Sequence, residues 1–193
     1  MEIIIHRINT LKELNNVPSK YGVEIDIRAN GSNIILNHEP FKKGDRLIDY
    51  IACYRHGTLI LNIKEAGIEE DVLKIVKSAA IKSYFLLDIE MPYVYSSWKE
   101  GNKNIAVRFS EYESIEAAEF FQNIFDWIWI DTVTQLPIAK TNLPIISKFK
   151  SCIVCPGRWN RKHDIIIYKK ILDTLNYVPN AVMTSYECVN LWK

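Results

Sequence analysis

Short apolar segments that resemble β-strands alternate with amphipathic helical segments along the chain, and this alternation restricts the possible folds more than any other feature. It is typical of parallel strands joined by crossover helices, so the sequence predicts an α/β protein. Eight such strand–helix units are expected. The predicted strands are Glu2–His6, Val23–Arg28, Thr58–Lys64, Tyr84–Glu90, Ile105–Phe109, Trp127–Asp131, Ser151–Cys155 and Ala181–Thr184.

One further strand is expected directly after the second unit. Asn30-Gly31 is a strong hairpin-turn signal, and residues 33–38, with apolar residues at 34–36, would return from it. Thr10 and Glu13 have the spacing of a capping box, which predicts a helix that begins near residue 11. That helix is expected to continue to about Tyr21, with Pro18 ending or bending it. The later helices are predicted over residues 45–54, 68–80, 93–99, 115–123, near 145, and over 164–176.

Polar side chains stand at the carboxyl ends of most of the predicted strands. In a (β/α)8 barrel these ends form one rim, where the active sites of such barrels lie, whereas an open doubly wound sheet would spread them along an edge. One shared mouth explains the pattern better, so a compact (β/α)8 TIM barrel is predicted, with a short hairpin after strand 2, as a single domain over residues 1–193. The polar residues at these ends are His6, Glu24, Asp26, Asn62, Lys64, Asp88, Glu90, Arg108, Asp131 and Thr184.

Glu24 and Asp26 lie two residues apart on an otherwise apolar strand, so both side chains point to the same face. Two adjacent carboxylates on a buried strand are unfavourable unless a positive charge lies between them. A divalent cation meets this need, since carboxylate oxygens are ligands that Mg²⁺ and Ca²⁺ prefer. The alternative is a half-exposed strand whose polar face meets water.

Composition indicates an ordinary water-soluble protein. The formal net charge of +1 gives no electrostatic basis for binding nucleic acid or an anionic membrane. No apolar run approaches the ~20 residues that a membrane helix needs, and the first residues lack the pattern of a secretory signal. Four cysteines are compatible with a reducing compartment, so a cytoplasmic location is expected. Cys152 and Cys155 lie in an apolar strand and are expected to be buried structural residues.

Four short motifs together resemble one enzyme family. They are His6-Arg7, Glu24-Ile25-Asp26, His38-Glu39 after the hairpin, and Asn62-Ile63-Lys64 on the third predicted strand. Their order is similar to that of the glycerophosphodiester phosphodiesterases, within the phospholipase-C-like phosphodiesterase barrels. The resemblance extends over nearly the whole chain and is sharpest in the first 64 residues.

The resemblance implies a role for each of these residues. His6 and His38 would be the acid–base pair, and Arg7 and Lys64 would contact the phosphate. Two imidazoles can take both proton-transfer roles near neutral pH. The metal ligands would be Glu24, Asp26 and Asn62. In the family a hydroxyl next to the phosphate can attack first, which gives a cyclic phosphate that water then opens.

This sequence departs from the family pattern at several positions. The family's third carboxylate ligand is replaced by Asn62, and the acidic residue after the second histidine is Glu39 instead of Asp. The insertion that typically follows strand 2 is reduced to about residues 39–44. The resemblance therefore implies a weakly bound Mg²⁺ or Ca²⁺ ion. It also leaves open a catalytically silent barrel that binds a phosphorylated metabolite or partner.

Three further residues outside the motifs are candidates. Arg158 follows strand seven, where barrels often bind phosphate, and is a candidate phosphate contact. Trp127 and Trp129 are expected in the core. The alternative is that Trp129, which shares a face with Asp131, forms a stacking platform for a base or sugar. The function that we expect is that of a metal-assisted phosphoric diester hydrolase. Its substrate would be a small soluble diester, glycerophosphodiester-like or nucleotide-linked, and neither nucleic acid binding nor membrane insertion is expected.

Overall fold

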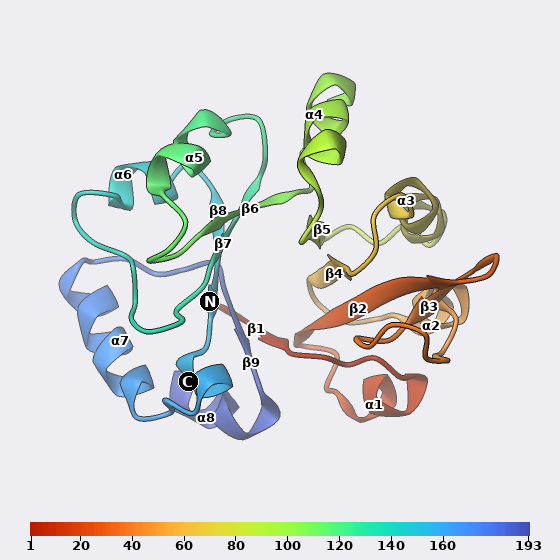
Figure 1. Ribbon diagram of the computed structural model, residues 1–193. Helices are drawn as coiled ribbons and strands as arrows, with labels where there is room; N and C mark the ends of the chain where they lie inside the picture. The colour runs from red at the N-terminus through yellow and green to blue at the C-terminus, as the bar shows by residue number, and fades with distance from the viewer. The chain divides into compact units, whose positions relative to one another are not determined.

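The computed structural model describes residues 1–193 and contains nine strands, eight α-helices and two short 3-10 helices (Figure 1). In chain order the elements are β1 (Glu2–Ile5), α1 (Leu11–Asn16), β2 (Gly22–Asn30), β3 (Asn33–Leu36), α2 (Leu47–Cys53), β4 (Leu59–Ile63), α3 (Glu69–Ser78), β5 (Tyr84–Leu87), α4 (Met91–Glu100), β6 (Ala106–Phe109), α5 (Ile115–Phe120), β7 (Trp127–Ile130), α6 (Leu143–Ile146), β8 (Lys150–Val154), η1 (Pro156–Trp159), α7 (Asp164–Thr174), β9 (Ala181–Thr184), η2 (Tyr186–Cys188) and α8 (Val189–Trp192).

The hydrogen-bonded strand order is β5-β4-β2-β1-β9-β8-β7-β6, and β3 pairs with β2 outside this path. The ladders from β2 through β5 and from β6 through β9 are parallel, whereas β3 runs antiparallel to β2. Strands alternate with helices as the sequence predicts. The order and the alternation confirm the fold class, a compact (β/α)8 barrel with a hairpin after its second strand.

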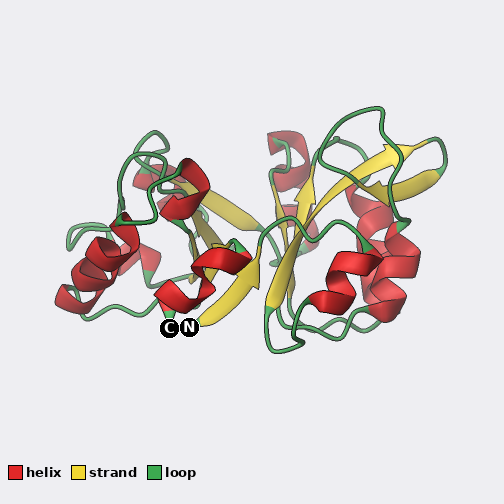
Figure 2. Ribbon diagram, turned by 90° about the horizontal axis from the view of Figure 1, so that it is seen from below, coloured by secondary structure: helices red, strands yellow, loops and turns green.

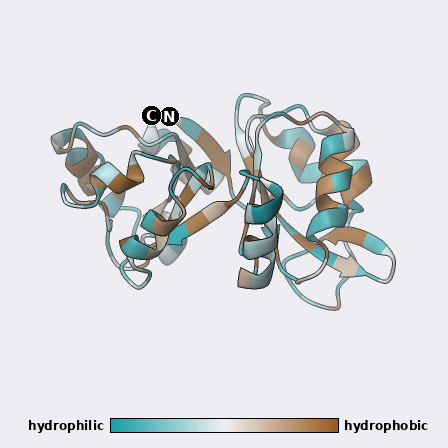
Figure 3. Ribbon diagram, turned by 90° about the horizontal axis from the view of Figure 1, so that it is seen from above, coloured by the Kyte–Doolittle hydropathy of each residue, from teal (hydrophilic) through white to brown (hydrophobic).

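The chain divides into two compact units, residues 5–96 and residues 1–4 with 97–193. We describe them separately, and the single domain stays a prediction. Strands in both units are mostly hydrophobic, while the loops are largely hydrophilic (Figure 3). None of the helices combines the length and the apolar character needed to cross a membrane.

In the unit of residues 5–96, strand β2 presents two chemically different faces. Val23, Ile25 and Ile27 are fully buried on one face. Glu24 and Asp26 are on the other face and are also buried, at 1% and 0% exposure. The prediction that both carboxylates share a buried face is confirmed, and a half-exposed strand is excluded.

Helix α1 begins as predicted but ends early. Thr10 accepts a hydrogen bond from the backbone N–H of Glu13, whose side chain accepts one from the Thr10 N–H, so the capping box is confirmed. The helix ends at Asn16 rather than near Tyr21. Val17 is extended because the residue before a proline, here Pro18, is sterically disfavoured in helical conformation.

The loop of residues 39–44 is short and packs tightly against the end of β3. A Cβ at Gly44 would lie 2.0 Å from the backbone oxygen of Leu36. The Leu36 N–H donates to the oxygen of Asp45 at 2.9 Å, and the Asn37 side-chain amide donates to the oxygen of Lys43 at 2.9 Å. These bonds fix the chain on both sides of Gly44, so a larger residue would have to displace backbone there.

The other unit contains β6–β9 and carries both chain termini (Figure 2). The backbone N–H of Glu2 donates to the oxygen of Asn180 at 2.7 Å, which ties the start of the chain to the segment before β9. Cys152 and Cys155 are buried free thiols, as predicted for structural cysteines, whereas Cys53 in the unit of residues 5–96 is exposed. Helix α8 was not predicted.

Candidate active site

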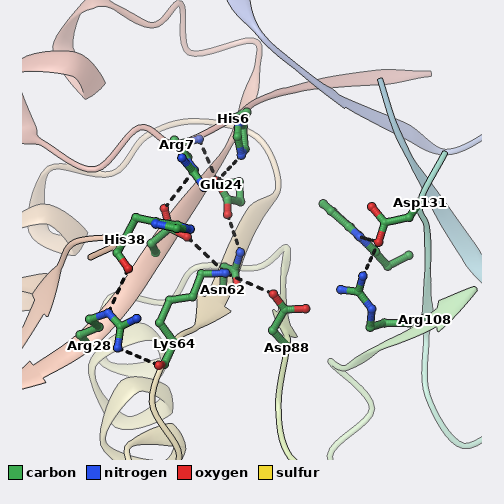
Figure 4. A network of polar contacts seen from close by, with 12 residues as sticks. His6, Arg7, Glu24, Arg28, His38, Asn62, Lys64, Asp88, Arg108 and Asp131 are labelled. Atoms are coloured by element: carbon green, nitrogen blue, oxygen red, sulfur yellow. Dashed lines mark hydrogen bonds and ion pairs between the residues drawn. The ribbon is translucent and has the colours of Figure 1, made fainter. Parts of the chain in front are cut away.

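Glu24 accepts hydrogen bonds at both of its carboxylate oxygens. The backbone N–H of Arg7 donates to Oε2 at 2.8 Å, and the side-chain amide of Asn62 donates to Oε1 at 2.8 Å. His6 Nε2 lies 4.0 Å from the same Oε2 (Figure 4). Burial, and secondly the negative charge of Asp26, raise the pKa of Glu24 to about 7, against the lowering effect of the two donors.

Asp26 is held from several sides. The side chain of Asn9 donates to Oδ2 at 2.9 Å and accepts a hydrogen bond from the backbone N–H of Asp26 at 2.8 Å. One side-chain amide thus fixes both the carboxylate and the backbone of Asp26. Lys64 Nζ lies 3.5 Å from Oδ1, and Arg7 Nε lies 3.8 Å from Oδ2. The two buried carboxylates are therefore partly neutralised by side chains of this chain. Asn9 lies two residues after the His6-Arg7 motif, and the sequence alone indicated no role for it.

Lys64 makes a second ion pair that the sequence reasoning missed. Its Nζ lies 3.2 Å from Asp88 Oδ2, just beyond the end of β5. Asp88 has a left-handed backbone conformation, with φ of 58°. The polar pair Asp88 and Glu90 at a strand end was the available signal, but position in sequence does not say which of the two reaches Lys64.

His38 follows β3 and is held beside the buried carboxylates by its neighbours. The N–H of Asn37 donates to the backbone oxygen of Asp26 at 3.0 Å. His38 Nδ1 lies 2.6 Å from Glu39 Oε1. This hydrogen bond lowers the pKa of Glu39, and it leaves Nε2 of His38 as the ring nitrogen for proton exchange. Figure 4 shows His6 and His38 gathered near Glu24 with Arg7 and Lys64.

A cavity of about 510 Å³ lies beside His38. Its lining is polar on most sides and contains no aromatic ring other than the imidazole. The residues around it are Asn9, Thr10, Leu36, Asn37, His38, Lys43, Gly44 and Asp45. Lys43 and Gly44, at the end of the short loop, thus line a space that adjoins the histidine.

The residues expected to bind a metal supply oxygen atoms but little charge. Asp26 and Asn62 are register partners on β2 and β4, and their Oδ1 atoms are buried without a hydrogen-bond partner. Such oxygens suit a hard divalent cation. The structure places no three His, Cys, Asp or Glu side chains where together they could hold a metal ion. The groups available to a metal ion here are therefore two carboxylates and one side-chain amide.

The remaining predicted residues lie in the other unit. Arg158 is exposed on η1, away in sequence from the motifs, and its phosphate role stays a prediction. Trp129 is 5% exposed and donates its indole N–H to Asp131 at 3.2 Å, and Asp131 also pairs with Arg108. The expectation that Trp127 and Trp129 belong to the core is confirmed, and the alternative of a stacking platform is excluded, because a buried indole presents no open face to a base or sugar.

Solved structures with the same fold were found for nearly the full chain. One is designated a glycerophosphoryl diester phosphodiesterase from Agrobacterium tumefaciens, with a TM-score of 0.69, 12% sequence identity and coverage of 100% of this chain and 97% of that one. Another, a glycerophosphodiester phosphodiesterase from the same organism, gives a TM-score of 0.68, 10% identity and coverage of 97% and 99%. The resemblance drawn from the motifs is confirmed at the level of the fold. No protein-family model and no curated protein matches the chain.

Proposed function

We propose that this protein hydrolyses a small water-soluble phosphodiester, with His6 and His38 as the general acid and base. The observation that carries the proposal is that His6 and Lys64 lie against two buried carboxylates, while His38 follows an Asn37 whose N–H is bound to the backbone of Asp26 (Figure 4). The same fold occurs in structures designated glycerophosphodiester phosphodiesterases, which supports this class of reaction.

Each histidine has a carboxylate beside it. Glu39 holds Nδ1 of His38 at 2.6 Å, and Glu24 lies 4.0 Å from Nε2 of His6. In the proposed reaction one imidazole removes the proton from the attacking hydroxyl or water as the new P–O bond forms. The other gives a proton to the oxygen of the departing alcohol as the old P–O bond breaks. The carboxylates orient the rings and stabilise the imidazolium.

Arg7 and Lys64 supply the positive charge for the phosphate. Lys64 is mostly buried, with 17% of its side chain exposed, whereas Arg7 is 40% exposed and lies toward solvent. Fixed cations beside a site of developing negative charge stabilise the transition state more than they would in water. Arg158 remains a proposed additional contact.

We also propose that Glu24, Asp26 and Asn62 hold a divalent cation, Mg²⁺ or Ca²⁺, with low affinity. The two Oδ1 atoms of Asp26 and Asn62, which are buried and accept no hydrogen bond, support this proposal, although Lys64 Nζ lies 3.5 Å from that of Asp26. When bound, such an ion would offset negative charge on the phosphoryl oxygens.

One alcohol of the substrate is proposed to occupy the cavity beside His38. Its polar lining suits a hydroxyl-bearing group, and its volume of about 510 Å³ exceeds the needs of a single small alcohol. The group could be that of a glycerophosphodiester or a nucleotide-linked unit. A cytoplasmic location is proposed with this function, since all four cysteines are free thiols.

A second candidate function is a silent barrel that binds a phosphorylated metabolite. Asn62 favours it, because its amide N–H occupies Glu24 Oε1, an oxygen that a metal would need. In that case the Asn62 amide and Lys64 have a structural role, which is to compensate the buried carboxylates.

Turnover of bis(p-nitrophenyl) phosphate separates the two candidates. The purified protein is assayed with EDTA and with millimolar Mg²⁺, Ca²⁺ or Mn²⁺, followed by a panel of soluble glycerophosphodiesters and nucleotide diesters. Metal-stimulated release of nitrophenol supports the enzyme. No turnover under any condition, together with thermal stabilisation by a phosphorylated metabolite, would replace it with the binding protein.

A further inference from the structure

Arg28 joins the two segments that carry His38 and Lys64. It is on β2, four residues after Glu24, so it lies on the same face as both carboxylates. Its Nε donates to the backbone oxygen of His38 at 3.1 Å, and its Nη1 donates to the backbone oxygen of Lys64 at 2.9 Å (Figure 4). One half-buried guanidinium thus bridges two chain segments that come from opposite sides of β2.

The two segments are also bound to β2 just before the bridge. The N–H of Asn37 donates to the oxygen of Asp26, and the N–H of Lys64 donates to the oxygen of Ile27, both at 3.0 Å. Beyond these bonds the regular ladders end: β3 ends at Leu36 and β4 ends at Ile63. Arg28 therefore adds a tie where the sheet stops fixing the backbone, at His38 and Lys64 themselves.

We propose that Arg28 is a positioning residue, which holds His38 and Lys64 in a fixed relation through their backbone oxygens. The inference rests on the proposed function for the meaning of that relation. A guanidinium holds its donors in a rigid planar arrangement. Its two bonds therefore set both the distance and the relative orientation of the two segments. A lysine could make either bond but could not impose the same geometry on both.

A direct phosphate contact is the competing role for Arg28. Two of its donor nitrogens are already used by backbone oxygens, and Arg7 and Lys64 are the cations that lie against the buried carboxylates. The two roles predict different kinetics. A phosphate contact would mainly raise KM and would be partly retained by lysine, whereas a lost geometric tie lowers kcat.

The first test is kinetic and compares Arg28→Ala and Arg28→Lys with Arg46→Ala, an exposed arginine of the same unit that pairs with Asp49. We expect kcat to fall about 10- to 100-fold in both Arg28 variants, because small misplacements of catalytic groups have effects of this size. KM should change by less than about threefold, and guanidinium ion should partly restore kcat in Arg28→Ala only. A kcat within twofold of native, or a rise in KM that lysine reverses, overturns the proposal.

The second test does not depend on turnover and separates the inference from the proposed function. The imidazole resonances of His38 are followed by NMR in the native protein and in each variant, assigned through His38→Ala. We expect them to shift or broaden in Arg28→Ala and Arg28→Lys and to stay unchanged in Arg46→Ala. Unchanged His38 resonances in both Arg28 variants contradict the positioning role, whether or not the protein cleaves a diester. If Arg28→Ala does not fold, Arg28→Lys alone is decisive in both tests.

Discussion

Glu24 illustrates how far single residues could be predicted. Its burial, its shared face with Asp26 and its place beside His6 follow from the alternation on one strand and from the motif order. The partners of Lys64 and His38 beyond the motifs could not be predicted. Asp88 was expected at the same rim, but its pairing with Lys64 depends on a left-handed backbone conformation that leaves no pattern in the sequence. The two bonds from Arg28 to backbone oxygens leave no pattern either.

The first prediction concerns the histidines. Replacement of His6 or His38 by alanine should lower turnover by about 10²- to 10⁴-fold, the range typical for loss of a general acid or base. The control is His163→Ala, because that side chain is 76% exposed in the other unit. Circular dichroism and thermal unfolding should match the native protein. Near-native turnover in either site variant would remove that histidine from the proposed chemistry.

Asn62 carries the second prediction, since it replaces a charged ligand by a neutral one. Titration calorimetry should show weak binding of Mg²⁺ or Ca²⁺ to the native protein, EDTA should abolish activity, and millimolar metal should restore it. Asn62→Glu should tighten binding about tenfold or more, because ligand charge count tunes the affinity of such sites. Asn62→Gln, which adds length without charge, is the control. Activity indifferent to EDTA, with no binding heat in native protein or Asn62→Glu, rules out the metal.

The third prediction is a pH dependence of stability caused by Glu24. Its pKa is raised from 4.5 to about 7 in the folded protein, so the folded state binds more protons than the unfolded state between these values. The stability that Glu24 contributes is therefore complete below about pH 4.5 and is lost as the pH rises through about 7.

Urea unfolding in chelator-containing buffer measures this dependence. The free energy of unfolding of the native protein, relative to Glu24→Gln, should fall between pH 4.5 and 7 and level off above. Glu119→Gln, at an exposed position in the other unit, is the comparison. A difference between native protein and Glu24→Gln that is independent of pH would contradict the assignment.

Among the elements, those with strong local signals were predicted best. The capping box of α1 and the hairpin of β2 and β3 depend on a few adjacent residues, and both are confirmed. The ends of elements depend on competing effects. Pro18 acts on the residue before it, so α1 ends at Asn16 instead of near Tyr21. Helix α8, four residues long, is too short to give a periodic pattern.

The loop of residues 39–44 carries the fourth prediction. Gly44→Ala should destabilise the protein by about 1 to 3 kcal/mol, as forced overpacking does, because the new Cβ would lie 2.0 Å from the backbone oxygen of Leu36. Activity should fall as well, since the displaced backbone forms a wall of the cavity beside His38. Lys42→Ala, on the same loop but exposed, should leave stability unchanged. Equal urea midpoints for the two variants would show that the loop is not held tightly at Gly44.

At the scale of the whole molecule, the alternation of strands and helices was sufficient for the fold class. The pattern repeats over eight strand–helix units, so an error at the boundary of one element does not change the predicted fold class. Division of the chain into two units could not be read from the sequence, because no linker or change in composition marks residue 96. The proposed metal ligands, His6, His38 and Lys64 all lie in the unit of residues 5–96, and this followed only from the structure.

The fifth prediction concerns substrate size. The loop after β3 is short and the cavity beside His38 has a mostly polar lining, so the protein should prefer diesters in free solution to those in a bilayer. Glycerophosphoinositol and phosphatidylinositol vesicles, at equal head-group concentration, provide the comparison. Release of head groups from vesicles without cleavage of the soluble diester would reverse this conclusion.

The bond between Glu2 and Asn180 also has a consequence for protein synthesis. Strand β1 is synthesised before β2 to β9, yet the acceptor for the Glu2 N–H is made almost 180 residues later. At about 5 to 20 residues per second, this corresponds to a wait of about 10 to 40 s. Once residue 38 has been made, the nascent chain contains both His6 and His38. Strand β1, which ends directly before His6, still has no partner at Asn180. Full activity should therefore first appear after β9 has emerged from the ribosome.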